Sequence, residues 1–207
     1  MEELSIGNDI VDLVEQAPPL HPRFCSRVFS QSELERIGSC RKTLWLYWAA
    51  KEAAYKAMKR LLPDLDFVPI RFEFDQETKC ITTQSAIMHC QWVVTDDFVY
   101  VSCLSTPIAK HNYSFRDWIE KVENISQDRM INGVPLESTA VRLLAVRNIA
   151  KALALPESIL SISPREGFRT SSSNASSLIP RLYVRGDEAG NLLSFTHHGR
   201  FVACAFL

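Results

Sequence analysis

Three short segments of the chain hold polar side chains whose types and spacing suit catalysis, and the first is Ile6–Asp12. Its sequence, Ile-Gly-Asn-Asp-Ile-Val-Asp, is an apolar β-branched run interrupted by Gly-Asn-Asp. We expect a strand that bends there, with Gly7 letting a ligand approach the backbone and Asp9 projecting from the strand end. Taken alone, Asp9 more often fits a turn aspartate that bonds its own backbone. Asp12 shares a face with Asp9 only if the strand ends between them, so we treat it as secondary.

The second segment, Trp48–Lys56, reads Trp-Ala-Ala-Lys-Glu-Ala-Ala-Tyr-Lys. On a helix, Glu52 and Lys56 lie one turn apart on the same face. An exposed pair of this kind is common and stabilises a helix by only about 0.3–0.5 kcal/mol. Four alanines surround the two charges, which indicates that another element packs closely there and that the charges need partners.

The third segment, Ser194–Gly199, reads Ser-Phe-Thr-His-His-Gly. Adjacent residues on a strand point to opposite faces, so at most one of the two histidines faces a site. This excludes a metal clamp made by both. A lone histidine is more often a hydrogen-bonded structural residue than a ligand, so this segment supports no function by itself.

The elements that must position these side chains begin with a helix over residues 42–62. Apolar side chains recur there at three- and four-residue spacing, and no Gly or Pro intervenes before Pro63. Residues 23–37 follow three prolines and are expected to be helical, with Ser30 or Ser32 as a cap. The other expected elements are strands over 70–74, 87–94 and 98–104, helices over 115–123 and 138–155, and extended segments over 182–185 and 192–206.

The second half of this order resembles the first, which indicates a diverged internal repeat. Lys151-Ala152 follows Lys56-Ala57 by 95 positions, Pro164 follows Pro69 by 95, and Phe201-Val202 follows Phe98-Val99 by 103. The eight extra residues fall in the Ser-rich stretch 170–177, a surface loop or flap. We therefore expect an α+β fold, a pseudo-dimer of residues 1–112 and 113–207. Each half is a long helix packed on a small antiparallel sheet.

The composition fits a globular protein of the cytoplasm. The 207 residues are 46% apolar and 23% charged, with a formal net charge of −1, which excludes a surface that binds nucleic acid throughout. Six cysteines without a CxxC pair suit a reducing compartment. The N-terminus lacks a signal-peptide pattern and no run of 18 apolar residues occurs, so we expect no membrane partner.

Taken together and in this order, the three segments resemble the 4'-phosphopantetheinyl transferases, in particular the holo-acyl-carrier-protein synthase branch. The helical Trp-x-x-Lys-Glu-Ala-x-x-Lys is fairly specific, whereas the strand aspartate and the late Ser-x-Thr-His are weak alone. The segment Arg23-Phe24-x-x-Arg27-Val28-Phe29-Ser30 also resembles the family's sequence ahead of that helix. The likeness covers residues 6–62 and 180–207.

The resemblance implies transfer of the phosphopantetheine arm of coenzyme A to a serine of an apo acyl or peptidyl carrier protein, with release of 3',5'-ADP. Asp9 and Glu52 match the family's Mg²⁺ ligands, and such an ion is usually held by one or two carboxylates with phosphate oxygens and waters. Lys56 would support the pyrophosphate, which completes a catalytic group of Asp9, Glu52 and Lys56. The base that deprotonates the serine is either Glu52 or a metal-held water.

By the same analogy, His197 lies on the nucleotide part of coenzyme A, with Ser194 and Thr196 beside it. Candidates for the 3'-phosphate are Arg165, Arg169 and Arg181. Two departures from the family pattern stand out: Val11 replaces a second carboxylate, so a water would complete the coordination, and Asn8 replaces an apolar residue.

In long members of the family, two fused halves build one site between them, and this chain follows that pattern. Glu52 corresponds to Arg147 and His197 to Val94, so each half keeps what the other lacks, and we expect a monomer. Arg23, Phe24, Arg27 and Phe29 form a basic and apolar patch for an acidic carrier helix. An ordinary amphipathic helix with solvated arginines explains that patch equally well.

Two other functions stay open. One is a catalytically inactive paralogue that binds coenzyme A or a carrier protein, and intact Asp9, Glu52, Lys56 and His197 weigh against it. The other is an unrelated scaffold in which the helical motif is accidental.

Overall fold

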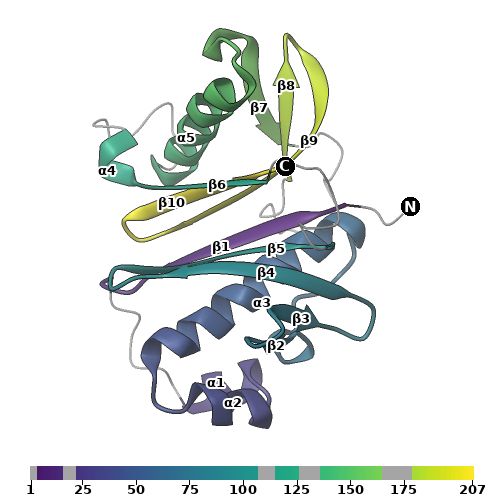
Figure 1. Ribbon diagram of the computed structural model, residues 1–207, viewed down its shortest axis with the longest axis vertical. Helices are drawn as coiled ribbons and strands as arrows, with labels where there is room; N and C mark the ends of the chain where they lie inside the picture. The colour runs from purple at the N-terminus through teal and green to yellow at the C-terminus, as the bar shows by residue number, and fades with distance from the viewer. Residues whose placement is uncertain (1–3, 16–21, 107–114, 126–135, 165–178) are drawn as a thin grey trace.

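The chain is built in four layers, with two antiparallel sheets packed face to face and a long helix on the outer face of each (Figure 1). The computed structural model describes residues 4–15, 22–106, 115–125, 136–164 and 179–207. Both sheets have five strands, in the orders β1-β5-β4-β3-β2 and β6-β10-β9-β8-β7. No helix in the described part of the chain is long and apolar enough to cross a membrane.

The first half holds eight elements besides a short 3-10 turn. They are β1 (Ile6–Asp12), α1 (Pro22–Val28), α2 (Gln31–Ile37), α3 (Arg41–Leu61), β2 (Glu73–Asp75), β3 (Cys80–Thr82), β4 (Ile87–Val94) and β5 (Phe98–Leu104), with the 3-10 turn η1 (Pro69–Arg71) before β2.

The second half repeats this order without counterparts of α1 and α2 in the residues described. Its elements are β6 (Arg116–Lys121), α4 (Val122–Ile125), α5 (Leu136–Leu153), η3 (Glu157–Ile159), β7 (Leu160–Pro164), β8 (Pro180–Val184), β9 (Asp187–His198) and β10 (Phe201–Phe206).

Close contact between α3 and β1 depends on small residues. A Cβ atom at Gly7 would lie 2.0 Å from the backbone oxygen of Ala53 and 2.5 Å from the backbone nitrogen of Ala57. The glycine therefore lets the helix, and not a ligand, approach the strand. The alanines of the Trp48–Lys56 segment are fully buried in this packing, as their size predicted.

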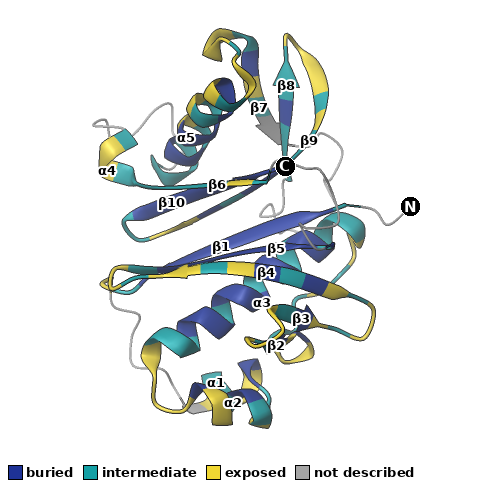
Figure 2. Cartoon of the chain, in the orientation of Figure 1, coloured by how far each residue is buried: buried dark blue, intermediate teal, exposed yellow. Residues whose placement is uncertain are grey.

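β1 is buried along its whole length because it is covered on both faces, and Figure 2 shows it in dark blue together with β10. One face carries Gly7, Asp9 and Val11 toward α3. The other carries Ile6 and Ile10 into two apolar clusters shared with β10. The halves thus meet in a sheet-on-sheet interface with β1 on its first-half side.

Several expected elements are confirmed, among them the helices over 42–62 and 138–155, the strands β4 and β5, and the Ser30 cap, which accepts from the Glu33 backbone N–H. The helix expected over 115–123 is wrong, because residues 116–121 pair with β10 as β6. The bend expected in β1 is also wrong, because Ile6–Asp12 pairs with β5 without interruption. β3 and β7 were missed, and residues 192–206 form two strands with a turn at Gly199.

Strand register defines which positions of the two halves correspond. Val94 pairs with Val99 in the first sheet, and His197 pairs with Val202 in the second, so both occupy the same place in their sheets. The predicted correspondence of Pro164 with Pro69 is wrong, because Pro69 begins η1 whereas Pro164 ends β7. The stretch 170–177 lies outside the described residues.

A buried ion pair joins α2, α3 and the segment before β2. Lys51 and Glu33 are both fully buried, with Nζ 2.7 Å from Oε2. Lys51 also donates to the carbonyl oxygens of Pro69 and Phe72, and Glu33 accepts from the backbone N–H groups of Ser30 and Phe74. Every polar atom of the pair is engaged, which is the condition under which a buried pair is tolerated.

We expect Lys51→Met to lower the free energy of unfolding by about 3–5 kcal/mol, because it leaves the Glu33 carboxylate buried without its cation. Denaturant titration measures the change. As the control, Lys42→Met removes the exposed pair of Lys42 with Asp96 and should have no measurable effect. Equal losses in the two variants would contradict this interpretation.

Candidate active site

Three polar side chains from three elements meet where β1, α3 and β9 come together. The Nζ atom of Lys56 lies 2.8 Å from Oδ1 of Asp9 and 3.0 Å from the carbonyl oxygen of Asn8. The hydroxyl of Thr196 donates to the same Asp9 oxygen at 3.0 Å. Asp9 and Lys56 belong to the first half and Thr196 to the second, so this cluster exists only when the halves are packed together.

Glu52 lies one helical turn before Lys56 and is half-buried. Burial, together with the nearby charge of Asp9, raises the pKa of Glu52 to about 7, while Lys56 acts in the opposite direction. Among the described residues, none is within hydrogen-bond distance of its carboxylate. Two carboxyl groups thus share a single ammonium, an arrangement that favours an added cation or a proton.

The acidic pair suits Mg²⁺ shared with a substrate better than a metal enclosed by the protein. Within the ranges that the structure describes, no group of three or more His, Cys, Asp or Glu side chains is placed to hold a metal ion. Mg²⁺ commonly takes only one or two carboxylates and completes its shell with phosphate oxygens and waters. Asp9 and Glu52 fit that donor set.

The free edge of β1 is covered by side chains from one face of β9. Ser194 Oγ accepts from the Asn8 backbone N–H at 3.0 Å, and His198 Nδ1 accepts from that of Asp12 at 2.9 Å. Thr196 lies between them on the same face of β9. The histidine that faces β1 is therefore His198, which the sequence reading passed over.

His197 lies on the opposite face of β9, because it pairs with Val202, a residue of the core beneath α5. Burial lowers the pKa of His197, and the charge of Glu137 opposes this. Asp9 and Lys56 also act on that pKa, so the imidazole lies within electrostatic range of the cluster while bonding to none of its members.

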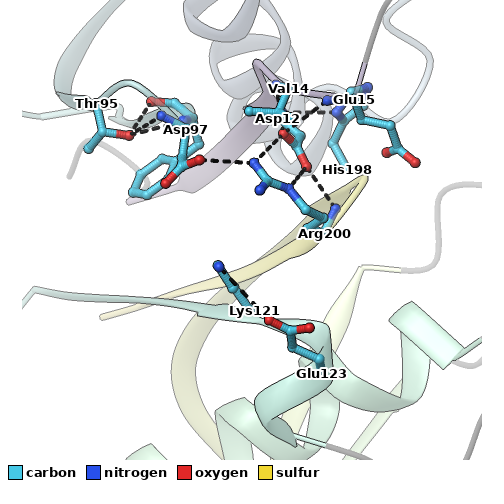
Figure 3. A network of polar contacts seen from close by, with 10 residues as sticks. Asp12, Val14, Glu15, Thr95, Asp97, Lys121, Glu123, His198 and Arg200 are labelled. Atoms are coloured by element: carbon cyan, nitrogen blue, oxygen red, sulfur yellow. Dashed lines mark hydrogen bonds and ion pairs between the residues drawn. The ribbon is translucent and has the colours of Figure 1, made fainter.

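Asp12 has a structural partner, Arg200, at the turn between β9 and β10 (Figure 3). Nε and the backbone N–H of Arg200 donate to Oδ2 of Asp12 at 2.8 and 2.9 Å, and a second guanidinium nitrogen donates to Oδ1 at 2.9 Å. Burial alone would raise the pKa of Asp12, but these bonds outweigh it and hold the pKa well below its usual range. Gly199 allows the turn to lie against Asp12, because its φ is +55° and a Cβ atom at this position would lie 2.7 Å from Oδ2 of Asp12.

The polar cluster is divided between the two halves, and comparison with known families covers the first of them. Residues 5–103 match the 4'-phosphopantetheinyl transferase superfamily. The resemblance predicted from the sequence is confirmed for this segment, which carries Asp9, Glu52 and Lys56. The superfamily is one of transferases. No curated protein and no solved structure matches the chain at a significant level.

A groove with aromatic walls opens beside the acidic pair of this superfamily segment. Its cavity has a volume of about 570 Å³. It is lined by Arg23, Phe24, Arg27, Val28, Trp48, Phe67 and Pro69. Trp48 lies one helical turn before Glu52, so the two share a face of α3. Three residues of the predicted patch line it, and Phe67, which sequence reasoning missed, comes from the loop after α3.

A smaller pocket of about 230 Å³ lies between the end of α3 and the β8–β9 hairpin. Arg60 and Arg181 line it from opposite halves, together with Glu188, which forms an ion pair with Arg181. Arg60 follows Lys56 by one helical turn. This spacing is visible in the sequence, although Arg60 was not among the predicted site residues. Arg165 and Arg169 lie outside the described residues.

We expect His198→Leu to lower the free energy of unfolding by about 1 kcal/mol, because it removes the acceptor for a backbone N–H at the free edge of β1. The neighbouring change His197→Leu serves as the matched control and should leave stability unchanged. Denaturant titration of both variants measures this. A larger loss in the His197 variant would show that the faces of β9 are assigned the wrong way round.

Glu52 generates a pH-dependent stability with a definite sign. Its folded-state pKa of about 7 lies above the ordinary value of 4.5. The folded state therefore holds the proton more tightly, and stability falls as pH rises from about 4.5 to 7. We expect the free energy of unfolding of the wild type to fall across that window by roughly 2 kcal/mol more than that of Glu52→Gln. This figure allows for solvent screening of a half-buried group. Added Mg²⁺ at pH 7.5 should stabilise the wild type more than the variant, and equal responses would contradict a cation site at Glu52.

Proposed function

We propose that the protein transfers the 4'-phosphopantetheine arm of coenzyme A to a serine of an apo acyl or peptidyl carrier protein. The observation that carries the proposal is the meeting of Asp9 and Lys56 from one half with Thr196 from the other. Beside them lies the Glu52 carboxylate, which has no hydrogen-bond partner among the residues described. The superfamily match over residues 5–103 supports the same reaction class. All parts of the site come from one chain, so we propose that a monomer is sufficient.

In this reaction the serine oxygen forms a bond to the phosphorus that carries the pantetheine arm, and the bond from that phosphorus to the oxygen of 3',5'-ADP breaks. Mg²⁺ held by Asp9 and Glu52 would neutralise charge on the pyrophosphate. Lys56 is placed to support the leaving oxygen, and Thr196 fixes the Asp9 carboxylate by a hydrogen bond. The serine proton would go either to Glu52 or to a water held by the metal.

Coenzyme A is proposed to lie between the halves, from the acidic pair toward the smaller pocket. Arg181 and Arg60 in that pocket would bind the 3'-phosphate, which would take the place of Glu188 as the partner of Arg181. The resemblance assigns the nucleotide part to His197, Thr196 and Ser194 of β9. Thr196 and Ser194 would act from the face that meets β1, Ser194 through its bond to that strand, and His197 from the other face.

The carrier protein is proposed to dock at the groove of α1 and α3. Arg23 and Arg27 give it positive charge, while Phe24 and Trp48 give it an apolar floor, with ring centroids 5.4 Å apart. This combination suits an acidic helix that presents an apolar side chain.

The six free cysteines suit a reducing compartment such as the cytoplasm.

The deciding experiment is mass spectrometry of an apo carrier protein incubated with the protein, coenzyme A and Mg²⁺. We expect the carrier to gain the mass of the arm, Glu52→Gln to abolish the gain, and Glu35→Gln, on the exposed face of α2, to leave it unchanged. Coenzyme A binding without transfer would instead support an inactive paralogue. Absence of both would reject membership of the catalytic group.

Charge reversal tests the docking groove. We expect Arg27→Glu to raise the KM for the carrier about tenfold, since it places a like charge against an acidic partner, and to leave the affinity for coenzyme A unchanged. Arg185→Glu, at the exposed β8–β9 turn, is the control for net charge and should alter neither. Steady-state kinetics with each substrate varied give the result, and an unchanged carrier KM in the Arg27 variant would refute docking there.

A further inference from the structure

The half-buried carboxyl of Asp117, in β6 of the second half, has no role in the site described above. It lies in the interface between the sheets and accepts from the hydroxyl of Tyr100 on one oxygen and from that of Ser102, at 3.0 Å, on the other. No cation bonds to it among the described residues. Burial raises the pKa of Asp117 to about 6, against the effect of its two hydrogen bonds. An acidic group kept between two packed sheets without a bonded cation among the described residues calls for an explanation.

Tyr100 extends this contact toward the candidate active site. Its hydroxyl, which donates to Asp117, also accepts from the side-chain amide of Asn8 at 3.4 Å. Asn8 directly precedes Asp9, and its carbonyl oxygen accepts from Lys56 Nζ. Its backbone N–H donates to Ser194. A continuous chain of hydrogen bonds therefore runs from Asp117 through Tyr100 and Asn8 to Lys56.

We propose that Asp117 and Tyr100 are positioning residues for Asp9 and Lys56, acting through Asn8. The inference rests on the proposed function, because it assigns the two residues to that reaction. A rotation of the peptide plane after Asn8 would swing its carbonyl away from Lys56 and move the Asp9 side chain with it. The chain of bonds opposes that rotation, because a shift of Asn8 also disturbs the Tyr100 and Ser194 contacts.

Ser102 provides a matched control for a purely structural role. Tyr100 and Ser102 both lie on β5, both are buried and both donate one hydroxyl to Asp117. Ser102 is the cross-strand neighbour of Asn8, but of the two hydroxyls only that of Tyr100 bonds to the Asn8 side chain. If Asp117 merely joins the halves, loss of either hydroxyl has the same effect on the reaction. If it positions the site, only the loss at Tyr100 does.

The first test compares Tyr100→Phe with Ser102→Ala in the transfer assay. We expect the Tyr100 variant to lower kcat about tenfold, the scale of one lost hydrogen bond, with KM unchanged for both substrates. The Ser102 variant should keep its kcat while losing thermal stability to a similar degree. Equal falls in kcat, or no fall in the Tyr100 variant, would overturn the proposal.

Conservative replacement of Asp117 supplies the second test. Asp117→Asn keeps an acceptor for Tyr100, so we expect kcat close to that of the wild type, whereas Asp117→Leu removes the acceptors and should behave like Tyr100→Phe. A loss in the Asn variant as large as in the Leu variant would assign the effect to charge and contradict positioning through hydrogen bonds.

A measurement without turnover separates this inference from the proposed function. In nitrogen-15 NMR spectra, Tyr100→Phe should shift the side-chain amide signal of Asn8 and the ammonium signal of Lys56. Ser102→Ala, a change at the cross-strand neighbour of Asn8, should shift the Asn8 signal less and leave the Lys56 signal in place. If the wild type transfers no arm to any carrier, the proposed function fails, while these shifts still report whether Tyr100 holds Asn8. Unmoved signals in the Tyr100 variant would overturn the positioning role.

Discussion

The structure depends on satisfying the free edge of a strand that is buried on both faces. β1 lies at the edge of its sheet between α3 and the second sheet, so its outward N–H groups have no strand partner and limited access to water. Ser194 and His198 accept from two of these groups, at Asn8 and Asp12, and each contact joins residues 186 positions apart. Thr196, between them, reaches Asp9. The same contacts that close the edge of β1 therefore complete the polar cluster.

The two halves share a strand order but not a chemistry. By strand register, Asp9 of the first sheet corresponds to Trp118 of the second. Asp9 pairs with Val101 on β5, and Trp118 pairs with Cys204 at the equivalent position of β10. Likewise Tyr100 of β5 corresponds to Ala203 of β10 by strand register. A large polar residue in one half thus faces a small apolar one in the other. This asymmetry allows the sheets to pack closely and leaves one acidic cluster per chain.

Charges in the interior divide into those with a fixed partner and those without. Lys51 with Glu33 and Arg200 with Asp12 are fully bonded, and they hold α2, α3 and the β9–β10 turn in place. In the part of the chain that the structure describes, Glu52 and Asp117 have no bonded cation of their own, and burial raises the pKa of each. Fixed pairs build the scaffold, whereas carboxyl groups whose charge is only partly compensated remain able to bind a cation or a proton.

Local sequence was sufficient for the features that depend on near neighbours. The spacing of apolar residues determined α3, the alanines indicated its close packing, and Glu52 and Lys56 shared a face because a helix repeats every 3.6 residues. Partners distant in sequence decided the rest. Residues 116–121 became a strand because β10 pairs with them, and the register of β9 set His198, and not His197, against β1. Thr196 meets Asp9 across 187 positions, a contact that no local pattern encodes and that only the packing of the two sheets creates.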